Sequence, residues 1–229
     1  MDDRRAARRT APCQRPVARR AGPTRRIRTS DDARAAFTRE CRMKPRKVKR
    51  LDPSASLAEN AAKIIKTRAS EFAELAGSAT KSGAAADLHD ARIAAKRLRY
   101  VLEVTGFCFG QDANAARKQA RDVQDLLGEI HDCDVLLPRV LAHIDSLRDA
   151  DAEAIRDSLS DDGTPTVEDL EWKDLNKAPA RRAYAGLERL ALLLQARREL
   201  LFSGFLASWD ALQREDFAER LDRALEVSR

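Results

Sequence analysis

The sequence predicts an all-α protein, an antiparallel helical bundle of about six or more helices. From Leu51 onward, apolar residues recur at spacings of three and four, and no segment alternates with period two. Of the 229 residues, 35% are charged and only 5% are aromatic, a composition that favours helices over a sandwich or barrel. No apolar run approaches the roughly 20 residues that cross a bilayer, so an integral membrane protein is not expected.

The first helix is expected to be capped by Ser54 or Ser56 and to end at Gly77. The small residues 78–85 then form a loop. A second helix is expected at 86–105 and, after a turn at 106–110, a third at 112–131. A fourth helix is expected to begin at a cap formed by Asp132 or Asp134. A long helix is then expected at 180–212, and a last short one from Asp216 to near Val227. In the helix capped by Asp132 or Asp134, Pro138 is tolerable only near the first turn. The stretch 158–179 is predicted as a loop or linker that contains a short helix around Trp172.

Positive charge is concentrated at the N-terminus. Residues 1–50 hold 18 of the 43 Lys and Arg residues but only five of the 37 acidic ones, so this segment has a net charge of +13 and the remainder −7. With few large apolar residues, residues 1–50 are expected to be a disordered Arg-rich tail, and residues 51–229 the helical domain. The tail has three interpretations: an arm for nucleic acid or another polyanion, a solvated tail, or an upstream extension preceding a native start at Met43.

The helix expected at 86–105 carries a basic ridge. At 100° per residue, His89, Arg92, Lys96 and Arg99 share an arc about 80° wide and about 15 Å long. Like charges at these spacings destabilise a helix slightly, whereas a linear polyanion would reward each of them with a charge-assisted contact. The alternative is a solvated face that pairs with carboxylates of neighbouring helices.

Two further polar lines repeat this pattern more weakly. On the next helix, one line follows spacings of three and four and comprises Arg117, Arg121, Gln124, Gly128 and His131. The other comprises Lys173, Lys177 and Arg181 with the adjoining Arg182, which can equally be a solvated stripe. Gly128 inside a helix indicates close helix packing or ligand approach, of which packing is the simpler explanation.

Arg68 and Arg198 fall on apolar helix faces, where we expect each to pair with a carboxylate. The four cysteines form no C-x-x-C pair, so a disulfide framework or zinc ribbon is not expected and a reducing cytosol is the default. His89-Asp90 and His131-Asp132 invite a metal-phosphohydrolase interpretation, but nothing supplies the further ligands of such a centre. Glycine-rich phosphate loops and nucleophile motifs are also missing, so we expect no enzyme, metal or cofactor.

Two segments resemble the CHAD domain family, the conserved-histidine α-helical domain. They are Leu88-His-Asp-Ala-Arg-Ile-Ala-Ala-Lys-Arg-Leu-Arg-Tyr100 and Val123-Gln-Asp-Leu-Leu-Gly-Glu-Ile-His-Asp-Cys-Asp-Val-Leu-Leu137. With flanking stretches, the resemblance covers about residues 50–226. Family members usually show two related four-helix halves, each with a basic motif. Here only one copy is clear, and residues 173–182 with Arg197 and Arg198 would have to serve as a degenerate second half.

The resemblance implies a non-catalytic helical module that binds inorganic polyphosphate through a basic groove or channel. The binding roles carry over first to His89, Arg92, Lys96 and Arg99, and then to Arg121. The resemblance further implies association with polyphosphate granules, which agrees with the cytoplasmic location expected from the cysteines. Two other functions stay open from the residues themselves: nucleic-acid binding through the Arg-rich tail, and metal-dependent phosphohydrolysis.

Overall fold

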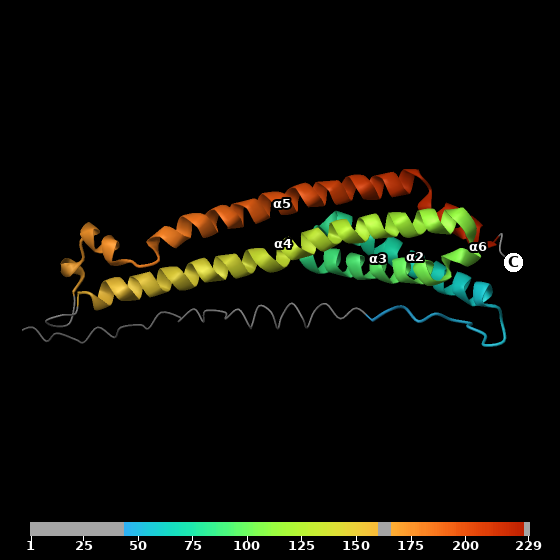
Figure 1. The fold of residues 1–229 in the computed structure, drawn as a ribbon, viewed down its shortest axis with the longest axis horizontal. Helices are drawn as coiled ribbons and strands as arrows, with labels where there is room; N and C mark the ends of the chain where they lie inside the picture. The colour runs from blue at the N-terminus through green and yellow to red at the C-terminus, as the bar shows by residue number, and fades with distance from the viewer. Residues whose placement is uncertain (1–43, 160–165, 227–229) are drawn as a thin grey trace, which may run out of the picture.

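A computed structural model of the chain describes residues 44–159 and 166–226. Its helices are α2 (Leu57–Ser82), α3 (Ala85–Thr105), α4 (Gly110–Asp157), α5 (Arg181–Arg214) and α6 (Phe217–Glu226), with 3₁₀ turns η1 (Gly106–Cys108), η2 (Val167–Asp169) and η3 (Trp172–Lys177). The described residues contain no strand. The predicted all-α antiparallel bundle is confirmed (Figure 1).

The hairpin of α2 and α3 begins where the sequence predicts but turns later. Ser56 caps α2, and a capping box joins it to Glu59. The helix does not end at Gly77 but continues to Ser82, where Gly83 takes the left-handed conformation at φ 60°. Gly77 failed as an end signal because glycine is tolerated inside a helix when neighbouring turns are well packed, as Phe72, Ala76 and Ala79 are here.

A second difference concerns residues 112–157. They were expected as two helices with a break at Asp132 or Asp134, but α4 is one continuous helix of 48 residues with Pro138 inside it. The Asp134 carboxylate that was expected to cap a new helix instead accepts a hydrogen bond from Arg198 Nε of α5, at 2.5 Å. Packing along α5 therefore supports α4 through the proline, which an isolated helix would tolerate poorly.

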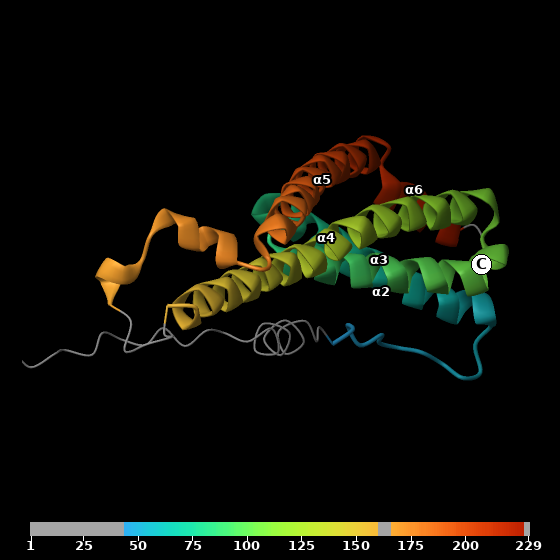
Figure 2. The ribbon, with the colours of Figure 1, turned by 60° about the vertical axis from the view of Figure 1, so that its left-hand side comes forward.

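Helices α4 and α5 run side by side and extend beyond the α2–α3 hairpin as a two-helix arm (Figures 1 and 2). The far end of the arm is fixed by Asp151 of α4, which is 4% exposed. Its carboxylate accepts a hydrogen bond from the Ala180 backbone N–H at 2.9 Å and another from the Tyr184 hydroxyl. A buried acid on α4 thereby caps the N-terminus of α5, where no local side chain does so.

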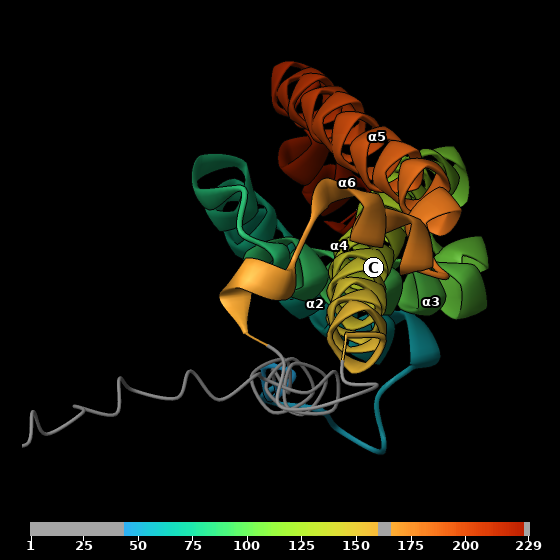
Figure 3. The same cartoon turned by 90° about the vertical axis from the view of Figure 1, so that its left-hand side faces the viewer.

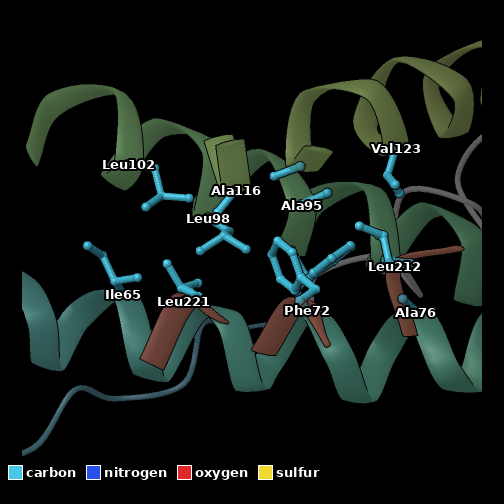
Figure 4. Close-up of a cluster of buried hydrophobic side chains, with 14 of the residues drawn as sticks. Ile65, Phe72, Ala76, Ala95, Leu98, Leu102, Ala116, Val123, Leu212 and Leu221 are labelled. Carbon is cyan, nitrogen blue, oxygen red and sulfur yellow. The ribbon is translucent and has the colours of Figure 1, made fainter. Parts of the chain in front are cut away.

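The core lies where α2, α3, α4, α6 and the C-terminal part of α5 meet. Phe72 of α2 is fully buried and makes edge contacts with Trp209 of α5 and Phe217 of α6, at centroid distances of 5.6 and 6.3 Å. Figure 4 shows Phe72 among aliphatic side chains, with Leu98 of α3 and Leu221 of α6 beside it. Viewed along the bundle, α4 lies between α3 and α5 (Figure 3).

The segment before α2 is extended and contacts the outer side of that helix. The Arg46 guanidinium forms an ion pair with Glu74, and the Arg46 backbone N–H donates to Glu71 at 3.4 Å. Residues 1–43, which make up most of the predicted tail, lie outside the described residues.

Candidate functional site

The basic ridge of α3 lies at its junction with α4. The rings of His89 and His131 are 4.9 Å apart between centroids, and a Cβ on Gly128 would lie 3.8 Å from Arg92 Nε. Moving three residues forward along α3 thus moves three residues back along α4, as expected for antiparallel helices. We refer to His89, Arg92, Lys96 and Arg99 of α3, with Gln124, Gly128 and His131 of α4, as the basic face.

The same register extends the basic face along both helices. One further turn sets Lys96 opposite Gln124, and the next sets Arg99 opposite Arg121. The Gln124 Oε1 atom is buried and accepts no hydrogen bond from the described part of the chain. The two polar lines expected from the sequence are therefore brought together, and they form one surface about 15 Å long.

The cations of the basic face are poorly compensated. Within the described ranges, Arg92 and Lys96 form no ion pair with a carboxylate, and Arg92 Nε is buried without an acceptor. Arg99 is only 20% exposed; it lies 3.7 Å from Glu103 at its Nη1 atom, while its Nε is likewise buried without an acceptor. A buried guanidinium nitrogen without an acceptor is unusual, because such atoms are normally satisfied by protein or solvent.

Tyr100 belongs to this surface and was not predicted as a site residue. The Arg99 guanidinium stacks 4.5 Å from the centroid of its ring, and Lys96 Nζ lies 5.6 Å from it. The ring restricts both side chains by cation–π contact. Its position directly after Arg99 and four residues after Lys96 was the available signal in the sequence.

Both histidines are biased toward the neutral form. Burial lowers the pKa of His89, and the nearby His131 and Arg92 lower it further. Burial and Arg92 likewise lower the pKa of His131, against the opposing effect of Asp132 and Asp134. The free protein therefore presents neutral imidazoles beside Arg92 at neutral pH, and an added anion would favour their protonation.

Other cations of the domain are neutralised on different sides. Arg97 of α3 faces α2, where the Glu71 carboxylate, which is 2% exposed, forms ion pairs with Arg97 at 2.9 Å and with Arg68 at 2.5 Å. The expected pairing of Arg68 is thus confirmed, as is that of Arg198 with Asp134. Arg197 is paired with Glu129 at 2.7 Å. Both α5 arginines considered for a second basic half are therefore occupied by carboxylates of α4.

The remaining candidate residues are divided between two places. Arg117 and Arg121 continue, by helical spacing, the line of Gln124 and Gly128 on α4, and Arg121 is 62% exposed and 3.5 Å from Asp125. Lys173 and Lys177 lie at the end of the arm and pair with Glu171 and Asp174, at 3.0 and 3.1 Å.

At the same end, Arg181 Nη1 donates to the Asn176 side chain at 3.1 Å. Arg182 lies in the first turn of α5, and its side chain is outside the described part. At 1.5 Å per residue this end of the arm is about 36 Å from Gly128 along α4, so the structure does not bring these residues to the basic face.

Features of other site classes were also sought among the described residues. No group of three or more His, Cys, Asp or Glu side chains there is arranged to hold a metal ion. Every helix in the described ranges is too polar or too short to cross a membrane. Cys133 is buried, and burial raises the pKa of its thiol, which is typical of an unreactive core cysteine.

Comparison with family models identifies the group to which these elements belong. The CHAD domain model matches residues 2–141, which end within α4. This chain belongs to the CHAD domain family. CHAD domains are associated with polyphosphate-related proteins. The searches of curated proteins and of solved structures gave no match.

Proposed function

We propose that this CHAD domain binds inorganic polyphosphate along the basic face and catalyses no reaction there. One observation carries the proposal: Arg92 and Lys96 are half-buried side by side on α3 without an ion-pair partner among the described residues. A chain of phosphates supplies closely spaced anionic oxygens, which are the acceptors that such cations lack.

The charge distribution supports the same conclusion. Residues 51–229 have a net charge of −7, so a general affinity for polyanions is not expected of this body. The buried carboxylate Glu71 and the acids Glu129 and Asp134 pair with Arg68, Arg97, Arg197 and Arg198 on other sides, whereas Glu103 approaches Arg99 of the basic face at 3.7 Å. A linear polyanion is therefore attracted to one surface and repelled by the rest.

The absence of catalysis is part of the proposal. Burial and Arg92 lower the pKa of both histidines, and among the described residues no cluster of metal ligands accompanies them. We also propose a cytoplasmic location, with recruitment to polyphosphate granules as a consequence of binding. No described feature favours the nucleic-acid or phosphohydrolase alternatives, and the tail residues 1–43 lie outside the described ranges.

Isothermal titration of the full chain with long-chain polyphosphate at two salt concentrations tests the proposal. We expect binding that weakens steeply with salt, because each neutralised phosphate releases counterions. Lys96→Ala should weaken binding by about tenfold or more, as the loss of one charge-assisted contact implies. Lys173→Ala, which removes an equal charge at the far end of the arm, should change the affinity less than about twofold.

Two results would overturn the proposal. The absence of heat at low salt would exclude polyphosphate as the ligand, and equal losses from Lys96→Ala and Lys173→Ala would place the site elsewhere. The variant with alanine at His89, Arg92, Lys96 and Arg99 separates the nucleic-acid alternative, since binding of single-stranded DNA through the tail would survive these substitutions. Phosphate release with and without divalent metal addresses hydrolysis, and we expect none.

A further inference from the structure

The outer side of α5 carries a second stripe of residues that its contact with α4 does not use. The helix buries Ala191, Leu194, Phe205 and Leu212 on the α4 side. At 100° per residue, seven residues that follow one another at spacings of four and three lie within an arc about 100° wide on the opposite side. We call these the α5 outer seam: Arg189, Leu193, Ala196, Leu200, Ser203, Ala207 and Asp210.

The α5 outer seam has the features of a helix-pairing surface. Its members follow the alternating four- and three-residue spacing of a heptad repeat over three turns of the repeat. All seven are exposed, Leu193 by 64% and Leu200 by 75%. A surface helix normally has one apolar stripe, so the exposed apolar members of this second line, Leu193, Ala196, Leu200 and Ala207, indicate a second partner.

The described part of the chain does not supply that partner. α5 forms the edge of the molecule in both the side view and the end view, with the other helices on its inner side (Figures 1 and 3). Among the helices, α5 packs mainly against α4 and to a lesser extent against α2 and α6, and the buried residues of α5 mark the side that makes these contacts.

The order of residues along the seam is complementary to its own reverse. When two copies are laid antiparallel with Leu200 facing Leu200, Leu193 faces Ala207, and Ala196 lies within one residue of the position that faces Ser203. Large residues then meet small ones. At each end Arg189 of one copy lies within one residue, about 1.5 Å along the axis, of the position that faces Asp210 of the other, so opposite charges meet at both ends.

We propose that α5 pairs with the α5 helix of a second copy of this chain in an antiparallel dimer whose two-fold axis passes near Leu200. Such an isologous interface uses the same patch on both copies, which the self-complementary order requires. The small residues at positions 196, 203 and 207 allow the helix axes to approach closely.

The dimensions of the seam set the strength of the dimer. In this register residues 186–214 overlap with their counterparts over about 43 Å. A contact strip about 10 Å wide buries somewhat over 400 Å² on each copy, which is below the size of a standard stable interface. The dimer is therefore weak, with a dissociation constant in the micromolar range, and depends on protein concentration.

Sedimentation velocity of the full chain from about 1 to about 200 µM tests the proposal, with these values chosen to bracket a micromolar dissociation constant. We expect the average mass to rise toward that of a dimer. Leu200→Glu should raise the dissociation constant at least tenfold, whereas Val104→Glu, at a 71% exposed position of α3, should leave it unchanged. A monomer at all concentrations, or equal effects of the two substitutions, would overturn the proposal.

Charge reversal and cross-linking test the antiparallel register. Asp210→Arg should weaken the dimer because it sets two arginines together at each end, and the added change Arg189→Glu should restore the dissociation constant to within about threefold of the original. Oxidation should cross-link Leu200→Cys but not Leu193→Cys, whose sulfur atoms would start about 21 Å apart along the axis. Failure of the charge rescue, or equal cross-linking at both positions above the wild-type background, would exclude this register.

Discussion

A substitution at Gly128 can neutralise the charge of Arg92 without removing its side chain. A Cβ at this position would lie 3.8 Å from Arg92 Nε, an ordinary van der Waals distance, so a side chain can enter without displacing α3. Gly128→Glu would place a carboxylate next to the guanidinium, and this carboxylate would be the internal ion-pair partner that Arg92 lacks among the described residues. Gly128→Gln has nearly the same shape and no charge, and serves as the matched control.

The expected effect follows from the contact that is lost. A charge-assisted hydrogen bond contributes about 1.5–3 kcal/mol, so losing the contact of Arg92 with a phosphate should weaken polyphosphate binding about 10- to 150-fold. Both substitutions also remove a glycine from the interior of α4, which should stabilise the fold by up to about 1 kcal/mol in each case. The difference between the two variants therefore isolates the charge.

Titration calorimetry at two salt concentrations measures this difference. Gly128→Glu should bind at least tenfold more weakly than Gly128→Gln, with a shallower salt dependence because one phosphate fewer is neutralised. On an Arg92→Ala background, the gap between the two variants should largely close, since their effects pass through the same guanidinium. Equal affinities of the Glu and Gln variants in the wild-type background would refute the assignment of Arg92 to the binding surface.

Three further outcomes are expected. His89 and His131 have lowered pKa values in the folded protein, so their contribution to stability is present above the unfolded pKa of about 6.5 and is lost as the pH falls through the folded pKa values. Polyphosphate affinity should instead rise as the pH falls over the same interval. Urea unfolding and binding titrations between about pH 5.5 and 7.5 should show these opposite trends, and both trends should flatten when the two histidines are replaced by glutamine. Asp134→Ala should cost about 1–3 kcal/mol of stability by leaving Arg198 without its carboxylate, yet change polyphosphate affinity less than about twofold. Pro138→Ala should raise the unfolding midpoint in urea, because it restores a backbone donor inside α4, and a lowered midpoint would show that the proline is needed there.

The basic ridge could be predicted from the sequence because it depends only on local geometry. Once residues 86–105 form a helix, the 3.6-residue period places His89, Arg92, Lys96 and Arg99 on one side, whatever the rest of the chain does. The contact between His89 and His131 needs the register of α3 against α4, which no local spacing contains. The stacking of Arg99 on Tyr100 depends on side-chain rotamers, which the sequence spacing does not determine.

The misplaced helix ends have a physical cause of the same kind. Gly77 and Pro138 are local signals to stop a helix, and both were overridden by packing against other helices. Asp134 is a good capping residue in isolation, but it lies opposite Arg198 of α5, and the ion pair uses its carboxylate. Capping and pairing compete for the same oxygen atoms, and the choice depends on a residue 64 positions away.

The pairing of charges on α4 explains how an acidic body can keep a basic surface. On the α5 side, Glu129 and Asp134 receive Arg197 and Arg198, so these acids do not compensate the cations of α3. On the α3 side, α4 presents Gly128 where an acidic residue could have neutralised Arg92.

The proposed pairing of α5 helices would leave this arrangement intact. It uses the outer side of α5, whereas the basic face lies on the α3 side of α4 (Figure 3). A dimer would then carry two separate basic faces, and a long polyphosphate able to reach both would bind more tightly than a short one of equal charge density. If the affinity depends on polyphosphate chain length in the wild type but not in Leu200→Glu, the long chains bind both basic faces of the dimer. If the dependence on chain length persists in Leu200→Glu, it arises within a single basic face.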